Sequence, residues 1–273
     1  MPRRLRLDAE LVRRGLARSR QQAAELIAAG RVKVAGAVAT KPATAVATDV
    51  ALVVTGAADT PDYVSRGGHK LAGALDELTA AGLVVAGRRC LDAGASTGGF
   101  TDVLLRRGAA EVVAADVGYG QLAWSLRQDP RVRVVDRLNV RDLTPAAIGG
   151  HVDLVVADLS FISLRLVLDA LLGAVTAEGD LCLLVKPQFE VGKDRVGRGG
   201  VVRDVRLRAD AVAAVAAAAT QRGCGTRGLA TSPLPGPSGN VEYFLWLREG
   251  ESLLSPEEIS SRITGAAGEK VEP

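Results

Sequence analysis

The stretch between residues 92 and 100 has the residue types of a cofactor-binding loop. It reads Asp-Ala-Gly-Ala-Ser-Thr-Gly-Gly-Phe and is followed, about twenty residues further on, by Asp116. Glycines let backbone N–H groups approach a ligand closely, and an acid that closes the next strand is a typical partner for ribose hydroxyls. The pattern predicts a cofactor that contains an adenosine group.

Two cofactor classes compete for this loop, a dinucleotide and S-adenosylmethionine (SAM). A dinucleotide loop normally reads G-x-G-x-x-G and places the pyrophosphate at a helix N-terminus. Here Asp92 stands at the head of the turn. Its carboxylate would repel a pyrophosphate but could pair with the ammonium group of SAM. The order of residues therefore favours SAM, and a glycine-rich turn without a ligand is the less favoured alternative.

Further contacts are expected where later strands end, because open α/β sheets bind ligands at the carboxyl ends of their strands. Asn139 and Asp142 follow the third strand, although Asp142 could equally cap a helix, and Asp158 ends the fourth. The predicted cofactor contacts are Asp92, Gly94, Ser96, Thr97, Gly98, Gly99, Phe100, Asp116, Asn139, Asp142 and Asp158.

Alternating strands and helices must position these residues. Periodicity predicts strands at 89–92, 111–116, 131–135, 152–158, 180–185, 226–231 and 242–247, and helices at 68–81, 98–107, 122–128, 164–174 and 205–222. This rhythm implies a mostly parallel sheet covered on both faces. The last two strands are joined by a Pro/Gly-rich loop without a helix, so they should pair antiparallel. We predict an α/β fold, a Rossmann-like SAM methyltransferase fold with seven strands.

The N-terminal segment has a different character. Leu7, Leu11 and Leu16 mark one helical face, Ser19 is a candidate N-cap for a second helix, and short strands follow near 31–34 and 51–54. Residues 1–49 carry ten Lys/Arg against four Asp/Glu, whereas the whole chain has a net charge of +3. A small basic α+β module suggests a polyanionic partner, and a merely solvated surface is an equally good interpretation.

Bulk features exclude several protein classes. Cys90, Cys182 and Cys224 form no C-x-x-C pair, and two scattered histidines do not suggest a metal site, so we expect no disulfide framework and no metal. The first residues lack the apolar region of a signal peptide, and no apolar run approaches the length of a membrane span. A reducing cytoplasm is the expected location, with no membrane association.

Motifs along nearly the whole chain resemble those of the TlyA family of ribosomal RNA 2′-O-methyltransferases. An S4 RNA-binding domain is suggested by Arg6-Leu-Asp8, Gly15, Ser19-Arg20, Ala23, Leu26-Ile27, the alternating run from Gly30 to Gly36 and Lys41-Pro42. An FtsJ-type methyltransferase domain is suggested by the motifs at 64–71, 92–100, 157–163, 184–190 and 239–242. The expected domains are 1–60 (S4-like, with a linker near 56–63), 64–250 (methyltransferase) and 251–273, a polar tail with at most a short helix near 256–263.

The resemblance implies a catalytic tetrad of Lys70, Asp158, Lys186 and Glu242. It also implies methylation of cytidine ribose 2′-hydroxyls in small- and large-subunit ribosomal RNA, with SAM as cofactor and ribosomal RNA or subunits as partners. No protein partner is readable. Some members are described as haemolysins, but no amphipathic or apolar membrane segment stands out here. Some relatives carry Arg-x-Trp where this chain has Pro61-Asp62-Tyr63, which puts interdomain signalling through that tryptophan in doubt.

Ribose methylation explains why such residue types are needed. A 2′-hydroxyl is a weak acid and must lose its proton as it attacks a methyl group. Lysine can accept that proton only where burial or a nearby cation disfavours its charged form. Lys186 ends an apolar run and Lys70 could be the cation, while Asp158 could orient Lys186, and Glu242 could position Lys70 or the ribose. Singly, each could be a solvated strand end, so the case rests on all four sharing one face.

Basic residues are the candidates for RNA contact. Contacts to phosphates would give affinity and salt dependence but little sequence choice. The predicted RNA-binding residues are Arg3, Arg4, Arg6, Arg18, Arg20, Arg31, Lys33, Lys41 and Arg66. The basic loop at 192–200 could also clamp phosphates or close over the site, or be a solvated loop. A non-catalytic RNA-binding assembly factor and, with less support, a membrane-active cytolysin are the competing functions.

Overall fold

The computed structural model describes residues 4–17, 19–55 and 63–268. The chain divides into two compact units, Met1–Asp62 and Tyr63–Pro273. Of the linker predicted near 56–63, only Tyr63 lies within the described residues.

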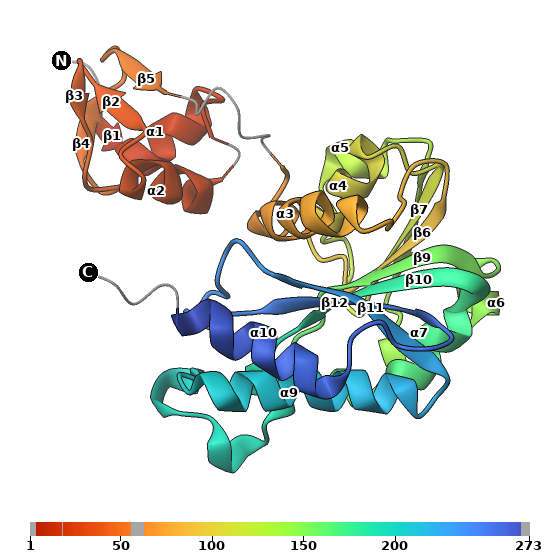
Figure 1. Ribbon diagram of the computed structural model, residues 1–273. Coiled ribbons are helices and arrows are strands. Elements are labelled where there is room, and N and C mark those ends of the chain that lie inside the picture. Colours follow the sequence, from red (N-terminus) through yellow and green to blue (C-terminus); the bar gives the residue numbers. More distant parts are fainter. Residues whose placement is uncertain (1–3, 18, 56–62, 269–273) are drawn as a thin grey trace. The chain divides into compact units, whose positions relative to one another are not determined.

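The smaller unit packs two helices with short antiparallel strands (Figure 1). Its elements are β1 (Arg4–Arg6), α1 (Leu7–Arg13), α2 (Arg20–Ala28), β2 (Val32–Val34), β3 (Ala37–Val38), β4 (Ala45–Ala47) and β5 (Leu52–Val54). β1 pairs with β4, and β2 lies between β3 and β5. The Ser19 side chain accepts a hydrogen bond from the backbone N–H of Gln22 at 3.1 Å, which confirms the predicted N-cap. Leu7, Leu11, Ile27 and Val32 form its buried core.

The larger unit contains one seven-stranded sheet. Its strands are β6 (Arg89–Ala93), β7 (Glu111–Asp116), β8 (Val132–Asp136), β9 (Val152–Ala157), β10 (Val175–Val185), β11 (Cys224–Thr231) and β12 (Tyr243–Glu249). Their spatial order is β11-β12-β10-β9-β6-β7-β8. Strands β6 to β10 pair in parallel, and β12 is antiparallel to both β10 and β11. The predicted fold, with its antiparallel last strand, is confirmed.

Helices cover both faces of this sheet (Figure 1). They are α3 (Arg66–Ala80), α4 (Gly99–Arg106), α5 (Trp124–Arg127), α6 (Pro145–Ile148), α7 (Leu168–Ala174), α8 (Pro187–Glu190), α9 (Val205–Thr220) and α10 (Pro256–Gly268), with the 3-10 helices η1 (Val140–Asp142), η2 (Leu164–Leu166), η3 (Lys193–Arg195) and η4 (Arg198–Gly200). Strand residues alternate between the faces: Cys90 and Cys182 pack toward α3 and α4, whereas Leu91 and Leu183 pack toward α7, α9 and α10. Burial on both faces explains the apolar strands.

The C-terminal segment corrects one prediction. The sequence suggests a polar tail beyond residue 250 with at most a short helix, yet α10 extends to Gly268 and packs on α9 (Figure 1). Leu254, Ile259 and Ile263 are buried in the main core. Two isoleucines four residues apart lie on the same side of a helix, so an otherwise polar segment still has a docking face.

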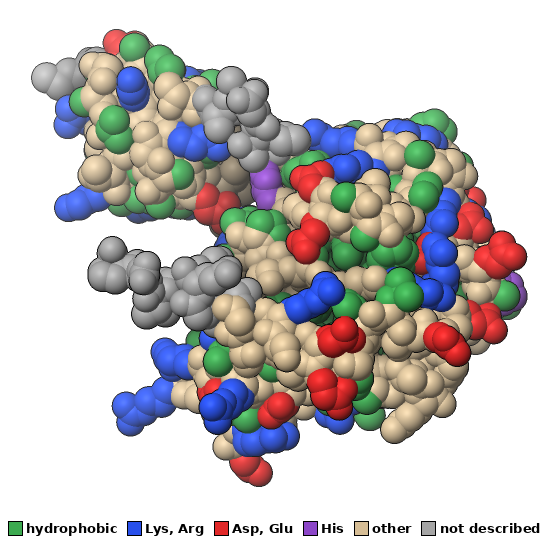
Figure 2. Space-filling model, viewed as in Figure 1, with side chains coloured by type: hydrophobic (Ala, Val, Ile, Leu, Met, Phe, Trp, Pro, Cys, Tyr) green, Lys and Arg blue, Asp and Glu red, His purple; other side chains and the backbone are tan. Residues whose placement is uncertain are grey.

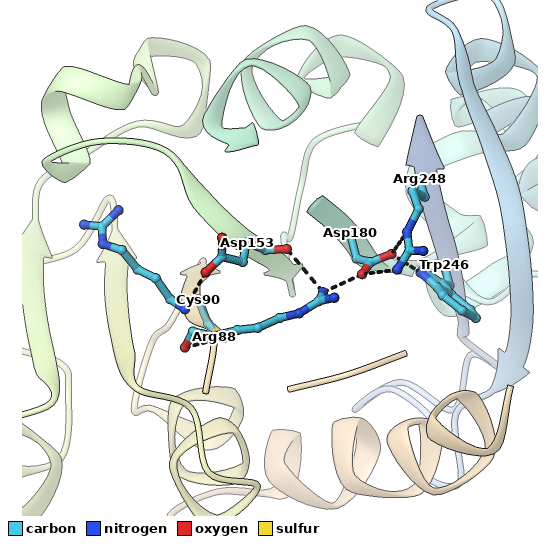
Figure 3. Close-up of polar contacts among 7 residues, drawn as sticks. Arg88, Cys90, Asp153, Asp180, Trp246 and Arg248 are labelled. Carbon is cyan, nitrogen blue, oxygen red and sulfur yellow. Dashed lines mark hydrogen bonds and ion pairs between the residues drawn. The ribbon is translucent and has the colours of Figure 1, made fainter. Parts of the chain in front are cut away.

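A fully buried carboxylate, Asp180 of β10, accepts hydrogen bonds from three residues, two on β12 and one just before β6 (Figure 3). One oxygen accepts from Trp246 Nε1 at 2.6 Å and Arg248 Nε at 2.8 Å; the other accepts from Arg248 Nη2 at 2.8 Å and from Arg88 Nη1. Burial alone would raise the pKa of Asp180, but the bonds from Arg248, Arg88 and Trp246 outweigh it and hold that pKa below its ordinary value.

Candidate active site

A cavity of about 570 Å³ opens at the carboxyl ends of β6, β7 and β9. It is lined by Ala93, Gly94, Ser96, Ala115, Asp116, Val117, Gln121, Leu138, Asn139, Val140, Arg141, Leu143, Asp158, Leu159, Ser160, Phe161 and Ile162. Apolar side chains provide much of this surface, and polar groups come from the strand ends. Such a cavity is where an open α/β sheet is expected to bind its ligand.

Backbone geometry in the predicted cofactor loop leaves no room for larger residues. Gly94 has φ +84°, and a Cβ atom added there would lie 2.8 Å from the carbonyl oxygen of Asp158. The carboxylate of Asp116 fixes the loop's other side, because it accepts from the backbone N–H of Ser96 at 2.8 Å and of Gly118 at 2.7 Å. The ends of β6 and β9 therefore come close together at Gly94, where only glycine leaves enough room.

Asp92 lies beneath the loop, with no exposed surface. One of its oxygens accepts from the backbone N–H of Thr101 at 2.8 Å and from the Thr101 hydroxyl at 2.7 Å, so it holds the start of α4. Within the part of the chain that the structure describes, its other oxygen, Oδ1, has no hydrogen-bond partner. Burial raises the pKa of Asp92 to about 7, and the negative charges of Asp158 and Asp116 add to this.

The unpartnered oxygen of Asp92 and the tight turn at Gly94 fit a ligand with a cationic group and an adenosine. These features agree with SAM, the cofactor that the order of residues in the loop favours, and disfavour a pyrophosphate. Of the predicted cofactor contacts, Gly94, Ser96, Asp116, Asn139 and Asp158 line the cavity.

The other predicted contacts, Asp92, Thr97, Gly98, Gly99, Phe100 and Asp142, are not in the lining. Phe100 packs on Phe244 with ring centroids 5.8 Å apart, and Asp142 is exposed in η1. The Asn139 side chain caps η1 by accepting from the backbone N–H of Arg141 at 3.0 Å.

Lys186 lies just beyond the end of β10 and is buried beside the cavity-lining residues Asp158 and Ser160. Its Nζ atom is 2.6 Å from Asp158 Oδ1 and donates to Ser160 Oγ at 2.9 Å. The two partners come from one segment between β9 and η2, so Lys186 joins this segment to the end of β10. Sequence reasoning did not single out Ser160, although the motif at 157–163 includes it.

Lys70 and Glu242 form a second buried ion pair. Lys70 lies on α3, and Glu242 is the residue just before β12. Lys70 Nζ donates to Glu242 Oε2 at 2.6 Å. Glu242 Oε1 has no hydrogen-bond partner among the described residues. A Cβ atom added to Gly236 would lie 2.5 Å from this oxygen, so the Pro/Gly-rich loop before β12 passes close to Glu242.

The four tetrad candidates thus form two ion pairs. The register of β10 and β12 pairs Val185 with Tyr243, and the register of β9 and β10 pairs Ala157 with Leu183. Lys186, Glu242 and Asp158 therefore lie at the same end of three adjacent strands.

Phe161 lies at the cavity rim with 92% of its surface exposed. Its φ of +65° is in the left-handed region, which is strained for an aromatic residue. The ring contacts Phe189 of α8 at a centroid distance of 5.4 Å. An exposed aromatic residue in a strained conformation, next to Lys186 and Asp158, was not predicted from the sequence.

The candidate RNA-binding residues in the smaller unit differ in their engagement. Arg6 and Arg20 both form ion pairs with Asp8, at 2.9 and 3.0 Å. The pKa of Asp8 is lowered to about 2, mainly by the hydrogen bond from Arg6. Arg31 donates to the carbonyl oxygen of Thr55 at 3.0 Å. The exposed candidates are Arg4, Arg6, Arg20, Lys33 and Lys41; Arg3 and Arg18 lie outside the described residues.

Basic side chains also occur on the larger unit. Figure 2 shows Lys and Arg side chains gathered over the segment between α8 and α9. Arg195, Arg198, Arg203 and Arg206 are exposed there. Arg66, at the start of α3, is exposed too and donates to the carbonyl oxygen of Pro235 at 3.3 Å.

The described residues contain neither a membrane-spanning helix nor a candidate metal site. The described helices include none that is both long and apolar enough to cross a membrane. Likewise, no cluster of His, Cys, Asp and Glu side chains in the described ranges could hold a metal ion. All three cysteines are buried and free.

Known proteins share both units of the chain. Residues 63–249 match the FtsJ-like methyltransferase family and residues 5–50 match the S4 domain. The 16S/23S rRNA (cytidine-2′-O)-methyltransferase TlyA of Mycobacterium tuberculosis is 63% identical over 98% of this chain and 99% of its own length. A candidate rRNA methyltransferase of Bacillus subtilis is 42% identical over 96% of this chain and 93% of its own. The solved structure of a candidate hemolysin from Streptococcus thermophilus has a TM-score of 0.76 and 37% identity, and covers 98% of this chain and 97% of that one. The chain therefore belongs to the TlyA family of methyltransferases, with an S4 domain and an FtsJ-like methyltransferase domain.

Proposed function

We propose that this protein transfers a methyl group from SAM to the ribose 2′-hydroxyl of cytidines in ribosomal RNA of the small and large subunits. The observation that carries the proposal is the buried Lys186, held by Asp158 and Ser160 beside the cofactor cavity. The name of the Mycobacterium tuberculosis relative supports the substrate. SAM, when bound, would supply an activated methyl group. An rRNA substrate implies an enzyme that works in the cytoplasm, where ribosomes are assembled.

In this proposal Lys186 Nζ faces the 2′-oxygen of the target ribose. Asp158 and Ser160 fix the position of Nζ, which matters because holding the reacting groups in line supplies much of the rate. Lys186 then acts as the base for the 2′-hydroxyl proton. A base must be neutral when it accepts a proton, so an ammonium at Lys186 would have to release one proton to solvent before this step.

The alternative role for Lys186 is a permanent ammonium that stabilises the charge developing on the 2′-oxygen. Lys186→Arg separates the two roles, because arginine keeps the charge but does not give up a proton. Turnover of Lys186→Arg as low as that of Lys186→Ala supports the base. Substantial turnover of the arginine variant that does not change between pH 6 and 9 contradicts it.

Lys70 and Glu242 would position the ribose. Glu242 Oε2 is occupied by Lys70, whereas Oε1 has no partner in the described part of the chain and can accept a hydrogen bond from a sugar hydroxyl. The exposed ring of Phe161 at the cavity rim can stack on the target base, as aromatic side chains do with unpaired bases in RNA.

The S4 domain would bind rRNA through phosphates. Lys33 and Lys41 are exposed, and the structure gives no ion pair for either among the described residues, so their charges are available to RNA. Lys41→Ala should weaken binding to rRNA fragments about equally for all sequences and reduce the slope of log K against log salt by about 1. An unchanged slope would argue against a phosphate contact at this residue.

The decisive experiment uses the full chain, methyl-labelled SAM and separated small and large ribosomal subunits from cells that lack the enzyme. We expect label on both subunits, and mapping of 2′-O-methylated riboses should place it on cytidines. Label on one subunit alone would narrow the proposal. No label on subunits, free rRNA or assembly intermediates would reject it in favour of a non-catalytic assembly factor. Dye release from liposomes at low protein concentration would instead support the cytolysin.

A further inference from the structure

The segment between β9 and η2, residues 158–163, carries most of the groups that surround Lys186. Asp158 and Ser160 contact Lys186 directly, and Phe161 projects from the same segment with a left-handed backbone. A loop in this conformation is not held by local preference, because φ near +65° is unfavourable for phenylalanine. Other parts of the protein must fix it.

One end of the segment is fixed by Lys186 itself, through the 2.6 Å contact with Asp158 and the 2.9 Å hydrogen bond to Ser160. The other end meets Glu190, the last residue of the four-residue helix α8, which starts immediately after Lys186. Lys186 and Glu190, four positions apart in the chain, therefore contact the two ends of the loop at 158–163.

The contacts of Glu190 are all directed at this loop and at the start of η2. One oxygen accepts from the Ser163 hydroxyl at 2.6 Å and from Arg165 Nε at 3.2 Å, and the other accepts from the backbone N–H of Leu164 at 2.6 Å. Arg165 also donates to the backbone carbonyl of Glu190 at 3.1 Å. Three consecutive residues therefore depend on one carboxylate.

Burial makes this carboxylate an expensive way to hold a loop. The Glu190 side chain is 1% exposed, and a buried carboxylate destabilises a fold unless its oxygens are fully hydrogen-bonded. Burial also raises the pKa of Glu190, although the donors from Ser163, Leu164 and Arg165 act against this. Since a neutral side chain could also cap η2, the use of a buried carboxylate that bonds three consecutive residues indicates that the position of the loop matters.

We propose that Glu190 is a positioning residue for methyl transfer: it holds residues 158–163 so that Asp158 and Ser160 face Lys186 and Phe161 stays at the cavity rim. The inference rests on the proposed function for its effect on turnover, but its effect on the loop can be measured without any activity. Glu190 does not line the cavity and has no assigned contact with cofactor or RNA.

The test compares Glu190→Ala, Glu190→Gln and Ser163→Ala with wild type. Hydrogen exchange of the peptide covering 158–166 should accelerate most in Glu190→Ala, where all three donors lose their acceptor. The kcat for rRNA should fall about 10- to 100-fold in that variant, because small misplacement of reacting groups has effects of this size. Glu190→Gln keeps one carbonyl acceptor and should recover part of the rate, and Ser163→Ala should show the smallest loss.

Asp180→Asn is the matched control, since Asp180 is an equally buried carboxylate that contacts neither the loop nor Lys186. It should lower the unfolding temperature but leave loop exchange and kcat per folded molecule unchanged. The proposal would be overturned if wild type is active and both Glu190→Gln and Ser163→Ala keep its kcat and its loop exchange. This outcome can be read even if Glu190→Ala fails to fold. A wild type inactive on every rRNA substrate would instead reject the proposed function, and loop exchange would still test the clamp.

Discussion

Asp92 and Asp180 are both completely buried in the same sheet, yet their surroundings treat the negative charge in opposite ways. They lie on β6 and β10, which β9 separates, and alternation places both on the face covered by α3 and α4, with Cys90 and Cys182. Asp180 receives four hydrogen bonds, three of them from arginines. Among the described residues Asp92 receives two, both from Thr101, and none from a cationic side chain.

The difference separates a carboxylate whose charge is fully compensated from one that keeps an open acceptor. A buried charge is tolerated when its partners replace the lost water, as they do at Asp180, and is costly otherwise. Asp92 keeps one oxygen without a partner within the described ranges, and it belongs to β6, at whose carboxyl end the cavity opens. Such a site gains most from a bound cation, so SAM should stabilise the fold as it binds.

The two carboxylates predict opposite pH dependence. The pKa of Asp92 is raised to about 7, so its contribution to stability is full below about pH 4 and is lost as the pH rises through 7. The pKa of Asp180 is lowered, so its contribution is present above about pH 4 and is lost as the pH falls through the lowered value.

The largest expected effect is on activity. It distinguishes Lys186, at the carboxyl end of β10, from the ion pairs of Asp180 earlier on the same strand. Lys186→Ala should reduce methyl transfer about 1000-fold, because general base catalysis and positioning are lost together, with little change in stability since Asp158 is partly exposed. Arg248→Ala also removes a cation from a carboxylate, but it should lower the free energy of unfolding and leave kcat per folded molecule unchanged. Initial rates and urea unfolding of both variants make the test. Similar profiles for the two would erase the distinction.

Asp180→Asn should lower the free energy of unfolding by about 3 kcal/mol. The amide directs an NH2 group at Arg88 or Arg248 and leaves these cations without a counter-charge. Because both arginines are partly exposed, the loss should fall at the lower end for a broken buried pair. Chemical unfolding at pH 7 measures it, and at pH 3 the gap between variant and wild type should narrow. A gap that is constant across this range would show that the charge of Asp180 does not matter.

Asp92→Asn should move stability and cofactor affinity in opposite directions. Asparagine can still accept from Thr101 but carries no buried charge, so the free energy of unfolding without SAM should rise by about 1 kcal/mol or more at pH 8. The gain should shrink as the pH falls below 7, where Asp92 becomes protonated in the folded state, and should disappear below about pH 4. Calorimetric titration with SAM should show weaker binding. If SAM binds the variant as well as wild type, the free oxygen of Asp92 has no role toward the ligand.

The sheet could be read from the sequence because its signals are local. Each predicted strand has a counterpart in the structure, since apolar runs between glycine turns are typical of strands buried on both faces. The length of helix α10 was underestimated because its docking face consists of few apolar residues in a polar segment. These residues are buried only because they pack against α9.

The sequence suggested candidate residues for the site but not the contacts between them. Lys70 and Glu242 are 172 positions apart, and no local pattern announces that they pair. Glu190 lies inside the Lys-Pro-Gln-Phe-Glu motif, yet its partners come from a loop about 26 residues earlier. Asp92 was expected to face the cofactor directly, but the start of α4 claims one of its oxygens. These outcomes depend on how strands and loops meet, which only the fold determines.

The smallest expected effect is a matched removal of one donor from each carboxylate. Trp246→Phe removes the indole N–H that Asp180 accepts at 2.6 Å, and Thr101→Val removes the hydroxyl that Asp92 accepts at 2.7 Å. At pH 8 each should lower the free energy of unfolding by about 1–2 kcal/mol, as expected for a hydrogen bond to a charged acceptor. At pH 5 the loss in Thr101→Val should shrink because Asp92 is then mostly protonated, whereas the loss in Trp246→Phe should persist because Asp180 stays ionised. Urea unfolding of both variants at the two pH values measures these losses. Equal losses at both pH values would mean that Asp92 is ionised throughout this range, and the contrast between the two carboxylates would then rest on geometry alone.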